Sequence, residues 1–311
     1  MRVLLLTPPM TQLNTPYPAT AYLTGFLRAH GGELGVAVTQ ADASLALFLR
    51  LFSAPWLERM AAVLKGRARS MRRGPAMPPS VAQFLADAPR YVATVDAAVR
   101  FLQGRDPSLA LRIVGRAFLP EGPRFAPLAQ AAAAGDDPLG AAFGALGTTD
   151  QARYLASLYV DDLADAWRDG IDPRFELARY GERLAASAPT FEPLEAALRA
   201  EPTLVDVALD ELAAELLAQH RPDVVGMSVP FPGNVYGAFR MARVMRAAAP
   251  QAKLVLGGGW VNTELRALAE PRVFDYFDYI TLDDGERPLL NLLARLAGRR
   301  VPLVRTYVRN G

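Results

Sequence analysis

The sequence contains no cysteine among its 311 residues. This absence excludes disulfide bonds, thiolate zinc sites, iron–sulfur clusters held by this chain and cysteine nucleophiles. Histidine is nearly absent too, because His30 and His220 are the only two. We therefore expect no metal site built from side chains of this chain.

Long apolar runs and an excess of one charge are also missing. No stretch approaches the roughly 18 uninterrupted apolar residues of a membrane span, and Pro8 and Pro9 break the apolar N-terminal run. The 34 Lys and Arg residues nearly balance the 32 Asp and Glu residues, which leaves a formal charge of +2. We expect a cytoplasmic protein with neither a nucleic-acid nor a membrane partner.

Short apolar runs alternate with helical patterns at both ends of the chain. The expected strands cover Val3 to Leu6, Val36 to Gln40, Asp223 to Val229, Lys253 to Leu256 and Tyr279 to Leu282. The expected helices cover Ala19 to Ala29, Val235 to Ala248 and Glu286 to Leu296. Such alternation predicts an α/β fold with a doubly wound parallel sheet, whose ligand binds at the carboxyl ends of the strands.

The middle of the chain has little strand signal and much Ala, Leu, Arg and Asp. Helical patterns such as Ala152 to Trp167 and Leu209 to Leu217 are separated by Pro-rich breaks, which predicts several helices. We expect a discontinuous sheet domain formed by 1–43 and 219–298. Residues 44–218 would form an all-helical insertion, and residues 299–311 a C-terminal linker or strand.

Glycine and serine residues lie at the expected strand ends. The first strand is followed by Pro8 and Pro9 without the GxGxxG fingerprint, which disfavours a nicotinamide or flavin Rossmann enzyme. Ser228 ends a later strand, but neither histidine is well placed as its base, so its hydroxyl is better suited to hydrogen-bond a ligand. The run from Gly257 to Gly259 follows the next strand, where missing side chains permit either a ligand or a tight turn.

These motifs together resemble the N-terminal cobalamin-binding domain of B12-dependent radical SAM enzymes. The resemblance rests on LLLTPPMTQLNTPYPATAYLTGFLRAHG, DVVGMSVPFPGN, KLVLGGGW and DYITLDDGERPLLNLL, and it covers roughly 1–43 and 219–298. It implies a Rossmann-like, flavodoxin-like cobalamin-binding fold. It also implies a slender slot for the nucleotide tail beside Ser228, Gly257 and Gly258, which Leu at both glycines would block while sparing the fold.

The resemblance implies a set of cofactor-binding residues and no catalytic residue. Asp283 and Glu286 would accept hydrogen bonds from corrin amides or ribose, although the helix dipole explains Glu286 equally well. The implied cofactor-binding residues are Pro8, Pro9, Met10, Gln12, Asn14, Tyr17, Ser228, Val229, Pro230, Phe231, Asn234, Gly257, Gly258, Gly259, Asp283, Gly285 and Glu286.

Two departures from wider cobalamin families limit the implied function. The Asp-x-His-x-x-Gly signature is absent, which implies base-off cobalamin without a histidine ligand. The cysteine motif of the radical SAM barrel is absent as well, so catalysis would need a radical SAM domain in cis or in trans. The expected function is a cobalamin-binding module that is not catalytic alone. The alternatives are a cobalamin- or nucleotide-dependent sensor whose helical insertion contacts a partner, and a scaffold that binds no ligand.

Overall fold

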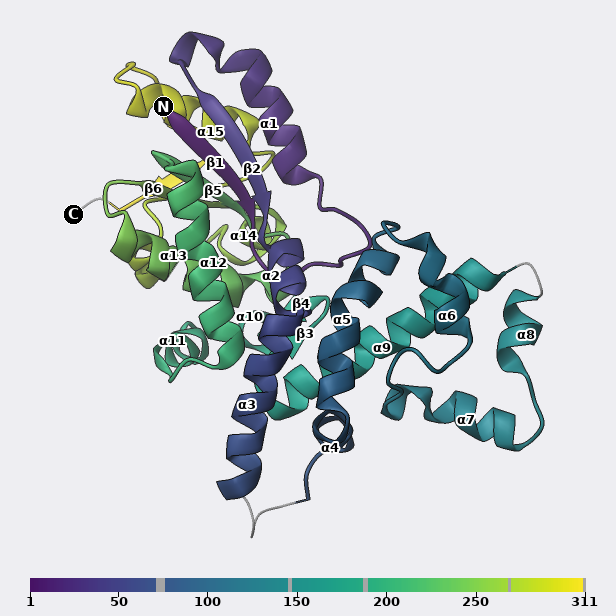
Figure 1. Cartoon of the computed structure of the whole chain (residues 1–311). Coiled ribbons are helices and arrows are strands. Elements are labelled where there is room, and N and C mark those ends of the chain that lie inside the picture. The colour runs from purple at the N-terminus through teal and green to yellow at the C-terminus, as the bar shows by residue number, and fades with distance from the viewer. Residues whose placement is uncertain (71–75, 145–146, 187–189, 268–269, 310–311) are drawn as a thin grey trace. The chain divides into compact units, whose positions relative to one another are not determined.

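A computed structural model describes residues 1–70, 76–144, 147–186, 190–267 and 270–309 (Figure 1). Its contacts divide the chain into two compact units. One unit comprises 1–47, 177–202 and 206–311, and the other comprises 48–176 and 203–205. Among its described residues, the expected insertion, 44–218, has helices and two strands of two residues each. Three parts of it, 44–47, 177–202 and 206–218, belong to the first unit.

The first unit is built around a six-stranded sheet in the order β2-β1-β5-β6-β7-β8. The strands are β1 (Arg2–Thr7), β2 (Ala37–Asp42), β5 (Val224–Ser228), β6 (Lys253–Gly257), β7 (Tyr279–Thr281) and β8 (Thr306–Val308). All neighbours are parallel except β7 and β8, which are antiparallel. The prediction that the first and third strands share one sheet is confirmed, because Val3 pairs with Val224.

Helices cover both faces of this sheet. Figure 1 shows α13 in front of the strands and α15 behind them. The helices of the first unit are α1 (Ala19–His30), α10 (Arg183–Ala186), α11 (Glu192–Arg199), α13 (Val235–Ala248), α14 (Gly259–Glu264), α15 (Glu286–Leu296) and most of α12 (Leu204–His220) and α2 (Ala43–Leu51). It also contains β4 (Arg179–Tyr180) and the short 3-10 helices η1 (Gly32–Leu34), η4 (Pro232–Asn234) and η5 (Pro271–Asp275).

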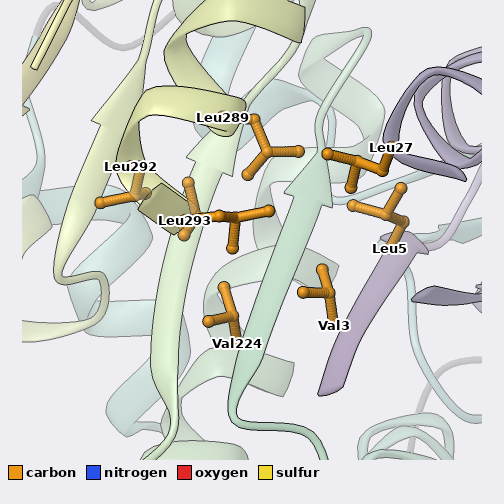
Figure 2. Packing of buried hydrophobic residues seen from close by; sticks show 8 residues of the cluster. Val3, Leu5, Leu27, Val224, Leu289, Leu292 and Leu293 are labelled. Atoms are coloured by element: carbon orange, nitrogen blue, oxygen red, sulfur yellow. The ribbon is translucent and has the colours of Figure 1, made fainter. Parts of the chain in front are cut away.

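Alternating strand residues form two separate apolar layers. Val3, Leu5 and Val224 pack with α1 and α15 through Leu27, Leu289, Leu292 and Leu293, as Figure 2 shows. The intervening residues Leu4, Leu6 and Val225 are also buried, and because side chains alternate along a strand they face the opposite layer. Burial on both faces explains why these strands read as continuous apolar runs.

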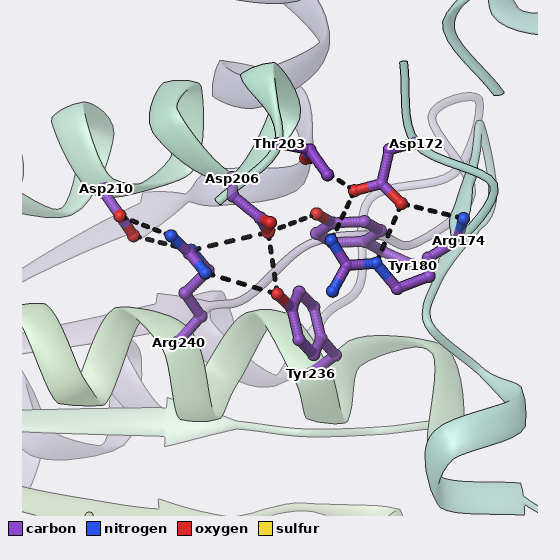
Figure 3. A network of polar contacts seen from close by, with 8 residues as sticks. All are labelled: Asp172, Arg174, Tyr180, Thr203, Asp206, Asp210, Tyr236 and Arg240. Carbon is purple, nitrogen blue, oxygen red and sulfur yellow. Dashed lines mark hydrogen bonds and ion pairs between the residues drawn. The ribbon is translucent and has the colours of Figure 1, made fainter. Parts of the chain in front are cut away.

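A buried polar network joins α12 to α13 within this unit (Figure 3). Arg240 on α13 donates to both carboxylate oxygens of Asp210, at 2.8 and 2.6 Å. Asp206 accepts hydrogen bonds from the Tyr180 and Tyr236 hydroxyls at 2.6 and 2.8 Å, and its carboxylate lies 3.5 Å from the Arg240 guanidinium. Each of these buried polar groups is therefore paired, as burial requires.

The second unit is helical and has its own core. Its elements are α3 (Ala54–Ser70), α4 (Pro79–Ala86), α5 (Ala88–Leu102), α6 (Ala110–Val114), α7 (Ala126–Ala133), α8 (Pro138–Phe143), α9 (Thr148–Gly170), β3 (Phe175–Glu176), η2 (Pro107–Leu109) and η3 (Pro123–Phe125). Tyr91 and Tyr159 stack with their ring centroids 5.5 Å apart. Asp172, which is fully buried, pairs with Arg174 and accepts a hydrogen bond from Thr203 (Figure 3).

Candidate functional site

A cavity of about 280 Å³ opens at the carboxyl ends of the parallel strands in the first unit. It enters between α1 and α15 and reaches the sheet, since residues of both helices and of β1, β5, β6 and β7 line it. Its lining residues are Leu5, Tyr17, Ala19, Thr20, Tyr22, Leu23, Gly226, Met227, Ser228, Val255, Gly257, Gly258, Gly259, Asn262, Thr281, Asp283, Asp284, Gly285 and Leu289. The position matches the edge where doubly wound sheets bind ligands.

The inner end of the cavity is apolar and depends on a glycine in the middle of β5. Leu5, Val255 and Leu289 line it and belong to the hydrophobic cluster of Figure 2. Gly226 lies between them in the sheet, and a Cβ there would come within 3.1 Å of Leu5 Cδ2. The missing side chain at Gly226 therefore leaves a slot between the sheet and the covering helices.

Two residues with hydroxyl groups, Thr20 and Ser228, line this slot and are largely buried. The Thr20 and Ser228 side chains are only 8% and 9% exposed, and both residues line the cavity. Neither hydroxyl hydrogen-bonds to any residue within the described ranges. Because a hydroxyl both donates and accepts hydrogen bonds, these two groups are suited to bind polar atoms of a ligand in the slot.

Gly257, Gly258 and Gly259 line the cavity, and all three also allow close approaches within the fold. Gly258 has φ +112°, and a Cβ on it would lie 2.5 Å from the Val229 carbonyl oxygen. A Cβ on Gly257 would lie 2.7 Å from the Thr281 hydroxyl oxygen. The expectation that Leu at both positions would spare the fold is therefore wrong, because Leu would collide with backbone and buried side-chain atoms.

The acidic residues of the site differ in their surroundings. Asp283, with Arg266 and Arg305 beside it, forms ion pairs with both, and these contacts lower the pKa of its carboxyl group. Its backbone N–H donates to Asn262 Oδ1 at 2.6 Å. Asp283 therefore fixes the loop after β7 against α14, while exposed Asp284 adds negative charge at the mouth.

Glu286 begins α15 directly after Gly285, which lines the cavity and has φ +80°. Its carboxylate lies beside the Tyr22 hydroxyl of α1 and raises the pKa of that hydroxyl. The Oε2 atom of Glu286 is buried without a hydrogen-bond partner among the described residues. The Glu286 side chain thus lies at the junction of α1 and α15, in addition to its favourable place at a helix N-terminus.

Several predicted site residues lie behind the cavity and hold its loops together. Pro8, Pro9 and Met10 are buried, and the Met10 N–H donates to the Gly233 carbonyl oxygen at 3.2 Å. The Asn234 amide is fully buried and donates to the Pro8 carbonyl oxygen at 2.7 Å. These contacts tie the loop after β1 to the loop after β5.

Val229 and Pro230 are likewise buried in the loop after β5. The Val229 N–H donates to the Gly257 carbonyl oxygen at 2.7 Å, and its carbonyl accepts from the Trp260 N–H at 3.1 Å. These two bonds fix the loop beside the glycines that line the slot. Val229 and Pro230 are therefore placed to shape the slot rather than to line it.

A second hollow, of about 530 Å³, lies beside the mouth of the slot, and Tyr17 lines both. Gln12 and Phe231 line it as well, and the Tyr17 and Phe231 rings meet edge to face with centroids 6.0 Å apart. Phe231 is 56% exposed. Asn14 is exposed in the same loop and lines neither hollow. The strand-end edge thus presents an accessible aromatic surface next to the slot.

The sequence analysis missed Thr20, Gly226, Asn262 and Leu289, which all line the slot. Gly226 carried a detectable signal, because a glycine inside an apolar strand often marks a close approach by a ligand. The other three carried none, since a threonine, an asparagine and a leucine within helices have many ordinary roles.

The two histidines lie away from the slot. His30 ends α1 and precedes Gly35, whose carbonyl oxygen accepts from the Met1 amino group at the start of β1. His220 ends α12, four residues before β5 begins. Both are therefore at the amino ends of the strands. The described residues also include no group of three or more Asp, Glu, His or Cys side chains placed to hold a metal ion.

None of the helices within the described ranges is both long and apolar enough to cross a membrane. Comparisons with protein-family models, curated proteins and solved structures found no match for this chain.

Proposed function

We propose that this protein binds cobalamin, with the nucleotide tail of the cofactor inserted in the slot between α1, α15 and the sheet. The observation that carries the proposal is an apolar slot left by Gly226 and lined by the hydroxyls of Thr20 and Ser228, which hydrogen-bond to none of the described residues. A nucleotide tail has both parts that such a slot accepts, a flat apolar base and a polar ribose.

The size of the slot fits the tail rather than the whole cofactor. Its volume of about 280 Å³ lies just below the range of pockets for whole ligands, roughly 300–1,000 Å³. The broad corrin plate would remain outside, over the strand ends where Tyr17 and Phe231 form an accessible aromatic surface. Gln12 and Asn14 in the loop after β1 offer amide groups to the corrin periphery.

Insertion of the tail into the slot implies base-off cobalamin, because the base would then lie beside the sheet instead of below the metal. His30 and His220 end helices at the amino edge of the sheet, so we expect neither to replace the base. When bound, cobalamin supplies a cobalt centre that carries methyl groups or electrons. This chain contributes binding and orientation, and a cysteine-bearing radical SAM domain, in cis or in trans, would supply catalysis in the cytoplasm.

The test compares hydroxocobalamin with cobinamide, which has the corrin but lacks the nucleotide tail. The full chain is titrated with each, and binding is followed by tryptophan fluorescence and by the absorption spectrum of the corrin. We expect cobalamin to bind at least about tenfold more tightly and to show a base-off spectrum. Equal binding of the two corrinoids, or no binding of either, would reject the proposal.

A matched pair of variants on α1 locates the tail. Ala19 lines the slot, whereas Ala21 is exposed on the same helix and does not line it. Since overpacking a filled site costs about 1–3 kcal/mol, we expect Ala19→Trp to weaken cobalamin binding about tenfold and to leave cobinamide binding unchanged. Ala21→Trp should bind both like the wild type. Thermal unfolding of both variants shows whether the fold is preserved.

A further inference from the structure

The slot changes from polar to apolar along its length. Its polar lining residues lie at or after the strand ends or near the start of α1, as Ser228, Thr281, Asn262 and Thr20 show. Its inner residues lie in the middle of strands or about one turn further along the helices. They are Leu5, Leu23, Gly226, Val255 and Leu289.

The inner end offers no side-chain hydrogen bond among the residues that line it. Leu5, Leu23, Val255 and Leu289 have hydrocarbon side chains, and Gly226 has none. The backbone there pairs between strands, since Leu5 is in register with Gly226 and Gly226 with Val255. Thr24, one turn beyond Thr20, has a buried hydroxyl with no hydrogen-bond partner among the described residues, but it does not line the slot.

From this polarity we infer that the slot selects the base of the nucleotide tail and prefers 5,6-dimethylbenzimidazole to adenine. The inference rests on the proposed function and adds the chemical class of corrinoid that the site takes. The two methyl groups and the benzene ring of dimethylbenzimidazole match the hydrocarbon end of the slot. Adenine would bring ring nitrogens and an amino group to a place without partners.

The expected preference follows from the cost of burying unpaired polar groups. A buried donor or acceptor without a partner typically loses enough free energy to change an affinity by about fivefold to 150-fold. Adenine would lose water from several such groups at the inner end, whereas its ribose and phosphate would be bound as in cobalamin. We therefore expect cobalamin to bind about tenfold or more tightly than the adenine corrinoid, and the whole difference to come from the base.

The experiment titrates the full chain with cobalamin, with the corrinoid that carries adenine as its lower base, and with cobinamide. We expect cobalamin to bind most tightly and the adenine corrinoid about tenfold or more weaker. Equal affinities for cobalamin and the adenine corrinoid, both well above that for cobinamide, would overturn the base preference and leave the proposed function standing. Equal affinities for cobalamin and cobinamide would overturn both.

A pair of isosteric variants tests whether the inner end causes the preference. Val255 lines the slot, whereas Val225 is buried in the neighbouring strand on the opposite face of the sheet. Val255→Thr places a hydroxyl at the inner end. We expect it to reduce severalfold the ratio of the affinity for cobalamin to the affinity for the adenine corrinoid. Val225→Thr makes the same change away from the slot and should keep the wild-type ratio. The same ratio in both variants would overturn the assignment to the inner end.

Discussion

Gly258 combines a backbone angle that disfavours side chains with a close approach to a neighbouring loop. Its φ of +112° lies outside the region that other residues adopt readily. The space where its Cβ would lie is occupied by the Val229 backbone, whose oxygen and nitrogen would be 2.5 and 2.6 Å away. The glycine therefore serves the fold as well as the slot.

We expect Gly258→Ala to lower the free energy of unfolding by about 3 kcal/mol, the sum of backbone strain and of displacing the Val229 loop. Gly35→Ala is the control, because Gly35 has φ +61° but no atom lies within 4 Å of the place that the alanine methyl group would take. That variant should lose only about 1–2 kcal/mol. Urea unfolding measures both losses, and equal values would show that the loop moves without cost.

The carboxyl group of Asp162 in the second unit has a raised pKa because it is buried. Its carboxylate accepts from the Gly122 and Arg124 N–H groups, both at 2.8 Å, and its side chain is 4% exposed. Burial raises the pKa of Asp162 from 3.8 to about 6, despite these hydrogen bonds. The folded state therefore holds a proton that the unfolded state has released between these two pH values.

This difference predicts that stability falls as the pH rises from about 4 to about 6, by about 2–3 kcal/mol from this group. Asn at position 162 cannot titrate. The free energy of unfolding of Asp162→Asn should therefore fall less than that of the wild type as the pH rises from about 4 to about 6. Asp150→Asn, on the same helix but exposed, should follow the wild type. Urea unfolding across this pH range gives the three curves, and parallel curves for wild type and Asp162→Asn would contradict the prediction.

At the residue scale, the sequence predicted the edge of the sheet that forms the site better than the residues that line it. Ser228 and the run from Gly257 to Gly259 line the slot, as do Asp283 and Gly285. Pro9 occupies a similar place after a strand, yet α13 packs so closely that a Cβ on Gly237 would lie 2.4 Å from the Pro9 carbonyl oxygen. Whether a loop residue faces a cavity or a helix depends on such approaches, which local sequence does not encode.

At the scale of elements, the ion-pair network between α12 and α13 offers a direct test of their packing. Arg240 and Asp206 are each 1% exposed, so neither charge is compensated by water. We expect Arg240→Met to lower the free energy of unfolding by about 3–5 kcal/mol, because it removes the buried guanidinium that pairs with both Asp206 and Asp210. Urea unfolding of the full chain measures the loss.

The double variant Arg240→Met with Asp206→Asn separates loss of the ion pair between these two residues from simple loss of packing. The asparagine side chain would keep an oxygen for the Tyr180 and Tyr236 hydroxyls and carry no charge. The double variant should therefore be more stable than Arg240→Met alone. A further loss equal to that of Asp206→Asn by itself would show that the two residues act independently.

Most elements of the sheet unit were predictable because their signals are local. Continuous apolar runs predicted β1, β5 and β6, and the helix over Glu286 to Leu296 matches α15. β8 was expected only as part of a linker or strand, because it has three half-buried residues and no apolar run. Its place is set by the free edge of β7, where Tyr279 pairs with Val308, and such pairing between distant segments leaves little local pattern.

At the scale of the whole molecule, the sheet joins segments that the sequence separates widely. β1 lies between β2, which follows it closely, and β5, which comes only after the entire helical unit. The sequence predicted one sheet from its two ends, and the pairing of Val3 with Val224 bears this out. It did not predict the strand order or that 177–202 belongs to the first unit, since both depend on contacts between remote segments.

The pairing of β1 with β5 also means that β1 must wait for a late part of the chain to be synthesised before its second neighbouring strand exists. About 180 residues separate the end of β2 at Asp42 from the start of β5 at Val224, which corresponds to roughly 10–40 s of translation. During that interval the apolar β1 is on the ribosome with β2 as its only available neighbour and with its other edge open. Because an open apolar edge is a template for aggregation, we expect the nascent chain to be most prone to aggregate before β5 is made.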